Sequence, residues 1–176
     1  MKRVIYLLIF FLLFSSNLSP AFESNPDTND IGKGGRDDTS FLNNENSNFI
    51  KGNNSLKKAI KLKKKNKIEK AKKRLEKALN YFVLAYQEAP ENVEILNLLG
   101  FTYYLVGDSI MSEIYFLEGL KIDPNNNLIN QRLGVLYFNT KRISLAEERL
   151  KILSNCNCNE YSKLKKIISG TATSQY

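Results

Sequence analysis

Apolar residues from Ile68 onward recur at alternating steps of three and four positions. Such spacing keeps their side chains on one stripe of an α-helix, so the segment is predicted to be amphipathic. Pro90 ends the pattern because it cannot donate the backbone hydrogen bond that would continue the helix. Upstream, the helical pattern begins near Ser55, which we expect to be an N-cap. The stripe consists of Ile68, Ala71, Leu75, Ala78, Phe82, Ala85 and Ala89.

The same pattern returns further along the chain at one fixed interval. Leu99-Gly100 and Leu133-Gly134 stand at this interval, as do Pro90 and Pro124. A fixed period of this length is typical of a protein built from stacked copies of one small helical unit. Further sets in the same register are Ala78, Ser112 and Ala146; Phe82, Phe116 and Leu150; Ala85, Gly119 and Leu153; Tyr103 and Tyr137.

The central copy resembles the tetratricopeptide-repeat family, whose signature is W-x2-L-G-x2-Y, A-x3-F and P. The resemblance implies an all-α fold of tetratricopeptide-repeat helical hairpins, stacked as a short right-handed α-solenoid with a C-terminal capping helix. We expect repeats at about 55–92, 93–126 and 127–158, and a capping helix over 160–169. The matching residues are Leu96, in the position of the Trp, then Leu99-Gly100, Tyr103, Ser112, Phe116 and Pro124.

Small residues in this pattern indicate where helices approach one another. Gly100 and Gly134 on the first helices are expected to face Ser112 and Ala146 on the second helices. Val106-Gly107-Asp108 predicts the turn between the two helices of the central repeat, with Gly at the helix end and Asp or Ser109 as the next N-cap.

The outer copies depart from the pattern. In the last copy Asn130 occupies the bulky first position and Cys158 the proline position, which indicates a divergent terminal unit. In the first copy, counting back one period from the Leu-Gly-x2-Tyr motif reaches only polar side chains. Either residues 55–65 form a divergent first helix with a turn at Asn66-Lys67, or one long basic helix leads into the array; we favour the first alternative.

The amino terminus has the three parts of a secretory signal peptide. Met1-Lys2-Arg3 precedes an apolar run from Val4 to Phe14, and a polar stretch ends at Ala21. The apolar run would span about 16 Å as a helix, which is about half of a bilayer core, so a permanent anchor is the weaker interpretation. We therefore predict a signal peptide at 1–21 and a periplasmic or secreted protein, with membrane association as an alternative.

Two further segments lack helical periodicity. Residues 22–53 are dominated by Asn, Asp, Ser and Gly and are expected to form a disordered leader, because they bury too little apolar surface to offset their ordering entropy. The last residues, 170–176, are expected to form a flexible tail. The ordered domain is therefore predicted to cover 54–169.

Basic charge is concentrated in one segment. Residues 51–77 contain thirteen Lys and Arg against two Glu, whereas the chain after residue 77 has nine basic and ten acidic residues. The lysine-rich helix 57–77 is therefore a candidate for an anionic partner such as a membrane surface, although a solvated helix face is the favoured interpretation. Nucleic acid is disfavoured because no aromatic residues interleave these lysines. The candidates are Lys57, Lys58, Lys61, Lys64, Lys65, Lys72 and Lys73.

Candidate catalytic chemistry is missing from the sequence. The chain has no His, which removes the commonest general base and metal ligand. Its two cysteines, Cys156 and Cys158, are too few for a structural zinc site; a local disulfide, an intermolecular disulfide and free thiols all stay open. We expect a protein that is not an enzyme and that needs no cofactor or metal.

The resemblance then points to function. In this family the first helix of each repeat lines the concave side of the stack, so we predict an exported interaction module that grips a peptide or helix of another protein in this groove. It would act as an adaptor, scaffold or assembly factor; nothing in the sequence indicates its oligomeric state. Aromatic anchors beside amide groups suit such binding. The predicted groove residues are Asn97, Phe101, Tyr104, Leu105, Gln131, Val135, Phe138 and Asn139.

Overall fold

The structure, a computed structural model, describes residues 47–173. The predicted signal peptide, most of the predicted leader and residues 174–176 lie outside this range. All regular elements within 47–173 are helices, and none of them has the length and apolar character needed to cross a bilayer. In chain order they are α2 (Asn48–Lys64), α3 (Ile68–Glu88), α4 (Val93–Val106), α5 (Ser109–Ile122), α6 (Asn127–Asn139), α7 (Ile143–Leu153) and α8 (Asn159–Ile168).

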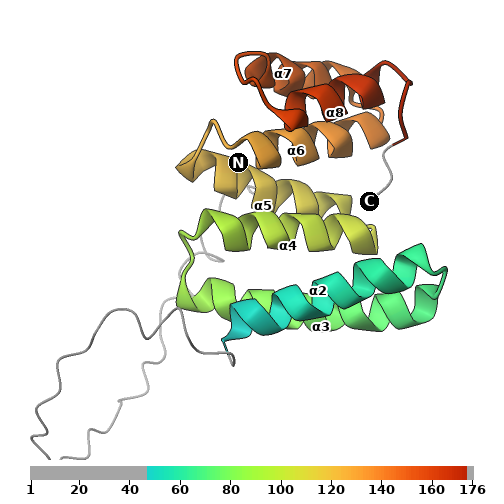
Figure 1. The fold of residues 1–176 in the computed structure, drawn as a ribbon. Coiled ribbons are helices and arrows are strands. Elements are labelled where there is room, and N and C mark those ends of the chain that lie inside the picture. The colour runs from blue at the N-terminus through green and yellow to red at the C-terminus, as the bar shows by residue number, and fades with distance from the viewer. Residues whose placement is uncertain (1–46, 174–176) are drawn as a thin grey trace, which may run out of the picture. The chain divides into compact units, whose positions relative to one another are not determined.

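The helices form three hairpins that stack in chain order (Figure 1). Helix α2 pairs with α3, α4 with α5, and α6 with α7, and each hairpin contacts the next. Helix α8 packs on α6 and α7 and closes the stack. This arrangement confirms the predicted all-α fold of stacked helical hairpins with a C-terminal capping helix.

The predicted turn of the central hairpin follows from Gly107. This residue has φ of 92°, in the left-handed region that a side chain disfavours, and the Asp108 amide donates to the Tyr103 carbonyl at 3.0 Å. The Asp108 side chain then accepts from the Met111 amide at 3.0 Å and caps α5. One repeat later Lys141 takes the equivalent left-handed position with φ of 64°.

The small residues of the first helices do mark close contacts, but with partners other than the expected ones. A Cβ atom on Gly100 would lie 2.6 Å from the Phe116 ring, and one on Gly134 would lie 2.5 Å from Leu164 of α8. Ser112 and Ala146 are fully buried, but they are not the side chains nearest to these glycines. Large side chains on the following helices therefore fill the space that the glycines leave.

The first hairpin begins earlier than the sequence predicts. Helix α2 starts at Asn48, with the Ser47 hydroxyl accepting from the Ile50 amide at 3.3 Å, so residues 48–53 are helical rather than part of a leader. The helix ends before a left-handed turn at Asn66, which confirms the alternative of two helices with a turn at Asn66-Lys67. Composition misled here because the segment is rich in Asn and Gly, although Gly52 is required for packing.

The first hairpin is also longer than its neighbours. A Cβ atom on Gly52 would lie 2.5 Å from Phe82, which makes Gly52 the counterpart of Gly100 and Phe82 the counterpart of Phe116. Phe82 precedes Phe116 by one period, but Gly52 precedes Gly100 by more than one period, and the excess equals the length of the segment 60–73. This added segment, the extension, lengthens each helix by about two turns or 10 Å, and it projects past the end of α4 (Figure 1).

Candidate partner-binding surface and lysine-rich extension

Two helices, α4 and α6, bring most of the predicted groove residues together. The Arg132 Nη1 atom donates to the Asn97 Oδ1 atom at 2.7 Å, and the Arg132 guanidinium lies 4.1 Å from the centre of the Phe101 ring. This combination of a hydrogen bond and a cation–π contact joins the two helices. Arg132 was not among the residues predicted from the sequence.

A second link between α4 and α6 lies nearer their C-terminal ends. The Asn139 Nδ2 atom donates to the Tyr104 hydroxyl at 2.6 Å. Asn139 is exposed, and Tyr104, Leu105 and Phe138 are half-buried. These four predicted residues therefore remain at the surface of the helix pair.

The other four predicted groove residues are buried. Val135 is 0% exposed because it packs with Leu153 and with Leu164 and Ile167 of α8. Its predicted accessibility to a ligand is therefore wrong, since the capping helix covers it. Phe101, Asn97 and Gln131 are 6%, 7% and 4% exposed, which gives them mainly a packing role in this structure.

A hollow of about 440 Å³ lies at the N-terminal ends of α4 and α6. We call it the α4–α6 hollow. The repeat register could have identified two of its residues, since Arg132 stands one repeat after Leu98, but the prediction did not include this position. The lining residues are Val93, Glu94, Asn97, Leu98, Asp123, Asn126, Leu128 and Arg132.

A polar cluster fixes the last hairpin on the central one. The Arg142 Nη1 atom donates to both carboxylate oxygens of Glu113, at 2.7 and 2.9 Å, and the guanidinium lies 4.5 Å from the centre of the Tyr137 ring. Burial, together with a hydrogen bond to the Glu113 carboxylate, raises the pKa of Tyr137 to about 12. The cluster is a structural joint with a titratable group at its centre.

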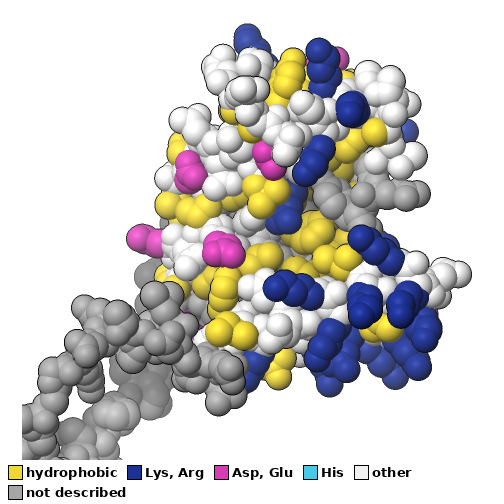
Figure 2. Space-filling model, viewed as in Figure 1, with side chains coloured by type: hydrophobic (Ala, Val, Ile, Leu, Met, Phe, Trp, Pro, Cys, Tyr) yellow, Lys and Arg dark blue, Asp and Glu magenta, His cyan; other side chains and the backbone are white. Residues whose placement is uncertain are grey.

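Lys and Arg side chains gather over the end of the α2–α3 hairpin (Figure 2). The extension, residues 60–73, contains eight Lys and one Glu. Among the described residues, no carboxylate forms an ion pair with any basic side chain of 51–77. The extension therefore presents uncompensated positive charge.

Part of this charge surrounds a hollow of about 280 Å³, which we call the lysine hollow. Of the predicted candidates, Lys58, Lys61 and Lys65 line it, whereas Lys57, Lys64 and Lys73 do not. Lys72 lines a separate hollow of about 330 Å³ beside Ile68 and Val106. The residues that line the lysine hollow are Lys58, Lys61, Leu62, Lys65, Lys67 and Arg74.

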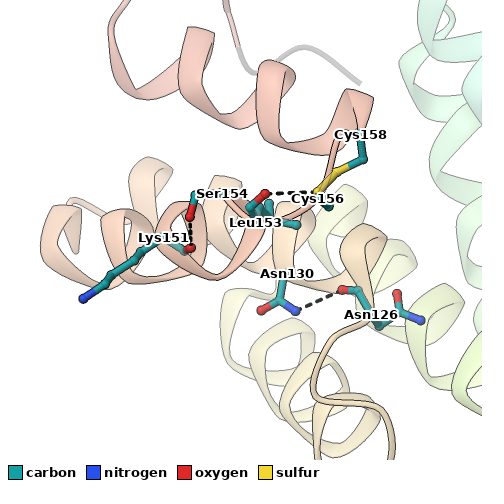
Figure 3. The surroundings of a disulfide bond; sticks show 7 residues. All are labelled: Asn126, Asn130, Lys151, Leu153, Ser154, Cys156 and Cys158. Atoms are coloured by element: carbon teal, nitrogen blue, oxygen red, sulfur yellow. Dashed lines mark hydrogen bonds between the residues drawn. A yellow bond between two sulfur atoms is a disulfide. The ribbon is translucent and has the colours of Figure 1, made fainter.

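The two cysteines form a local disulfide between α7 and α8 (Figure 3). The structure thus selects one of the three alternatives that the sequence left open. The Cys156 sulfur lies 3.0 Å from the Leu153 carbonyl oxygen, at the end of α7. No group of three or more Cys, Asp or Glu within residues 47–173 is placed to hold a metal ion.

Asn130, at the bulky position of the last repeat, has a defined role (Figure 3). It is fully buried, and its Nδ2 atom donates to the carbonyl oxygens of Pro124 and Asn126, each at 3.0 Å. The Arg149 Nη1 atom lies 3.4 Å from its Oδ1 atom. Asn130 therefore secures the loop between α5 and α6, and the divergence at this position is a substitution of packing by hydrogen bonds.

Comparison with known proteins supports the repeat and the fold. Residues 93–126 match the tetratricopeptide-repeat family profile, and no curated protein matches the chain. Among solved structures, the chain is similar to the first TPR of Spaghetti (RPAP3) bound to the HSP90 peptide SRMEEVD, with a TM-score of 0.51 and 15% identity. The alignment covers 70% of this chain and 94% of that one. The chain thus contains a tetratricopeptide repeat at 93–126 within an all-α solenoid of stacked helical hairpins.

Proposed function

We propose that the protein is an exported adaptor, scaffold or assembly factor that binds a peptide or short helix of another protein on the surface of α4 and α6. The repeat fold and a structural neighbour that holds a peptide support a protein-interaction module. The observation on which the proposal depends is the α4–α6 hollow. It places the apolar side chains of Leu98 and Leu128 beside the polar pair Asn97 and Arg132, which suits a partner that is anchored by an apolar side chain and oriented by hydrogen bonds.

The charges of the hollow bear on the partner's chemistry. The neighbour's peptide, SRMEEVD, is acidic. In this chain Arg132 is the single cation among the residues that line the α4–α6 hollow, and Glu94 and Asp123 line it too. We therefore propose a partner segment of mixed apolar and polar character rather than a strongly acidic one.

Photo-crosslinking from the hollow tests this proposal. A photoreactive phenylalanine analogue placed at Leu128, in the hollow, should form an adduct with a partner in the native cell, whereas the same analogue at Ile110 should not. Ile110 is a suitable control because it is an apolar residue that is 74% exposed on α5 and does not line the hollow. The cross-linked partner segment is then identified by mass spectrometry.

A matched pair of double variants then tests the contact itself. Leu98→Ala with a second apolar deletion, Leu128→Ala, should reduce binding of the identified segment by about tenfold, since each lost side chain removes roughly 1 kcal/mol or more of apolar burial. Ile110→Ala with Ile114→Ala removes two exposed apolar side chains from α5 and should leave binding unchanged. Equal adducts from both positions, or equal losses in both double variants, would contradict the groove assignment.

Export is the second part of the proposal. It rests on the amino-terminal pattern of positive charge, short apolar run and Ser-Pro-Ala ending. Amino-terminal sequencing of protein recovered outside the cytoplasm should begin at Phe22. Recovery of the chain with Met1 intact in the soluble cytosol would contradict export.

A second candidate function is contact with an anionic membrane surface or other polyanion through the lysine-rich extension. The observation that favours it is the absence, within the described residues, of ion pairs to the basic side chains of 51–77. Co-sedimentation with vesicles of phosphatidylserine and phosphatidylcholine should be strong at low salt and weak at high salt. Sedimentation that does not change with salt would exclude an electrostatic contact.

A further inference from the structure

We infer that the lysine hollow is a binding site for a compact anion that bears several phosphate groups. This inference deepens the second candidate function and rests on it where the phosphates belong to a membrane lipid. It differs from a diffuse electrostatic contact because it assigns binding to particular lysines and leaves neighbouring lysines out.

The cations of the hollow come from both helices of the first hairpin and from the turn between them. Lys58, Lys61 and Lys65 are spaced by three and four positions and so share one face of α2 and its C-terminal end. Lys67 follows the turn, and the half-buried Arg74 comes from α3. Five cationic side chains thus surround one opening of about 280 Å³.

The backbone of the turn holds these side chains in place. The Lys67 amide donates to the Leu62 carbonyl oxygen at 2.9 Å, and the Asn66 amide donates to the Lys63 carbonyl oxygen at 2.9 Å. With Asn66 in the left-handed conformation, these two bonds make the paired closure that commonly ends a helix. The entry of Lys67 into the hollow therefore follows from the turn geometry and does not depend on a chance side-chain conformation.

The electrostatics of the hollow favour a multivalent anion. No carboxylate lines it, and cations at spacings of three and four positions on a helix repel one another. An anion with several charges would relieve this repulsion at several side chains at once. Each lysine supplies three donors and the arginine a planar set, which matches the many acceptor oxygens of phosphate groups.

The lining also restricts the kind of anion. Leu62 is the only apolar residue among those that line the hollow, and no aromatic side chain is present there for base stacking. The opening is small compared with a typical ligand pocket of about 300 to 1,000 Å³. These properties fit a compact polyphosphorylated group, either a soluble one or a lipid headgroup presented by a membrane that the projecting extension reaches.

The test compares two triple variants of the full chain that lose the same charge. Lys58, Lys61 and Lys65 are changed to Gln in the hollow variant; Lys57, Lys64 and Lys73, which are exposed and do not line the hollow, are changed to Gln in the control variant. The probes are inositol hexakisphosphate, measured by calorimetry, and phosphatidylcholine vesicles doped with phosphatidylinositol bisphosphate. Vesicles with phosphatidylserine at matched surface charge measure the diffuse contribution. Circular dichroism verifies that both variants stay helical.

The hollow variant should lose about tenfold or more in affinity for inositol hexakisphosphate, and the control variant about threefold or less. Competition by inositol hexakisphosphate against bisphosphate vesicles would support a lipid source, and binding of the soluble probe alone would support a free anion. Equal losses in both variants would overturn the hollow while leaving the second candidate function intact. Failure of the unmodified chain to bind either phosphate probe would overturn the hollow, and failure to bind phosphatidylserine vesicles as well would overturn both.

Discussion

Gly52 lies against the ring of Phe82 so closely that a Cβ atom there would be 2.5 Å from it. The same relationship joins Gly100 to Phe116 in the central hairpin. Because both contacts need a residue without a side chain, they mark equivalent positions in the two hairpins. This equivalence shows that the first hairpin is a repeat of the same kind, lengthened at its turn by the extension.

Replacing Gly52 tests this register. Gly52→Leu should lower the free energy of unfolding by about 1 to 3 kcal/mol, since the new side chain must displace the Phe82 ring in a closely packed core. Asn54→Leu places the same side chain on an exposed position of α2 and should have little effect. Thermal unfolding followed by circular dichroism measures both; equal melting temperatures for the two variants would show that Gly52 is not at the contact.

Removing the extension gives a second prediction. Deletion of residues 60–73, combined with Ala59→Gly and Arg74→Asp, recreates the Gly-Asp turn that joins α4 to α5. The shortened chain should stay folded with a cooperative thermal transition, because the extension lies beyond the contacts that stack the hairpins (Figure 1). It should also lose its binding to phosphate probes. A molten or unfolded product would show that the extension contributes to the core.

The repeat period was sufficient to predict the central hairpin, because its turn at Gly107 and its contact between Gly100 and Phe116 depend on fixed spacings. The first helix could not be aligned in this way, since the extension shifts Gly52 away from the expected position. Its start at Asn48 was hidden by a composition rich in Asn and Gly, in which a residue required for packing looks like a flexible one.

The candidate site was predicted less completely than the fold. Tyr104 and Asn139 were identified from their place on the first helices, and the structure brings them together. Val135 was misplaced because its burial depends on α8, a contact that no local pattern encodes. The convergence of Lys58, Lys67 and Arg74 depends on the length of the first hairpin, which became visible only through packing.

Tyr137 predicts a loss of stability at alkaline pH. Its pKa is raised to about 12 in the folded protein, compared with 10.0 for the ordinary side chain, so the folded state keeps the proton that the unfolded state releases. This contribution is fully present below pH 10 and is lost as the pH rises from 10 to 12. Denaturant unfolding across this range should show a decrease that Tyr137→Phe reduces. Tyr161→Phe, which removes a hydroxyl with no hydrogen bond from the described residues, should leave the decrease in place.

Asn130 provides the last prediction, because the family pattern and the structure disagree about it. The pattern places a bulky apolar residue at this position, which would make Asn130→Leu a stabilising change. In the structure the Asn130 side chain is fully buried and donates to the carbonyl oxygens of Pro124 and Asn126. Leucine would remove both donors and leave these acceptors without them, at a cost of about 1 to 3 kcal/mol. We therefore expect Asn130→Leu to lower the melting temperature, with Asn127→Leu on the exposed side of the same helix as the control. A higher melting temperature for Asn130→Leu would show that apolar packing, and not the hydrogen bonds, decides the stability of this loop.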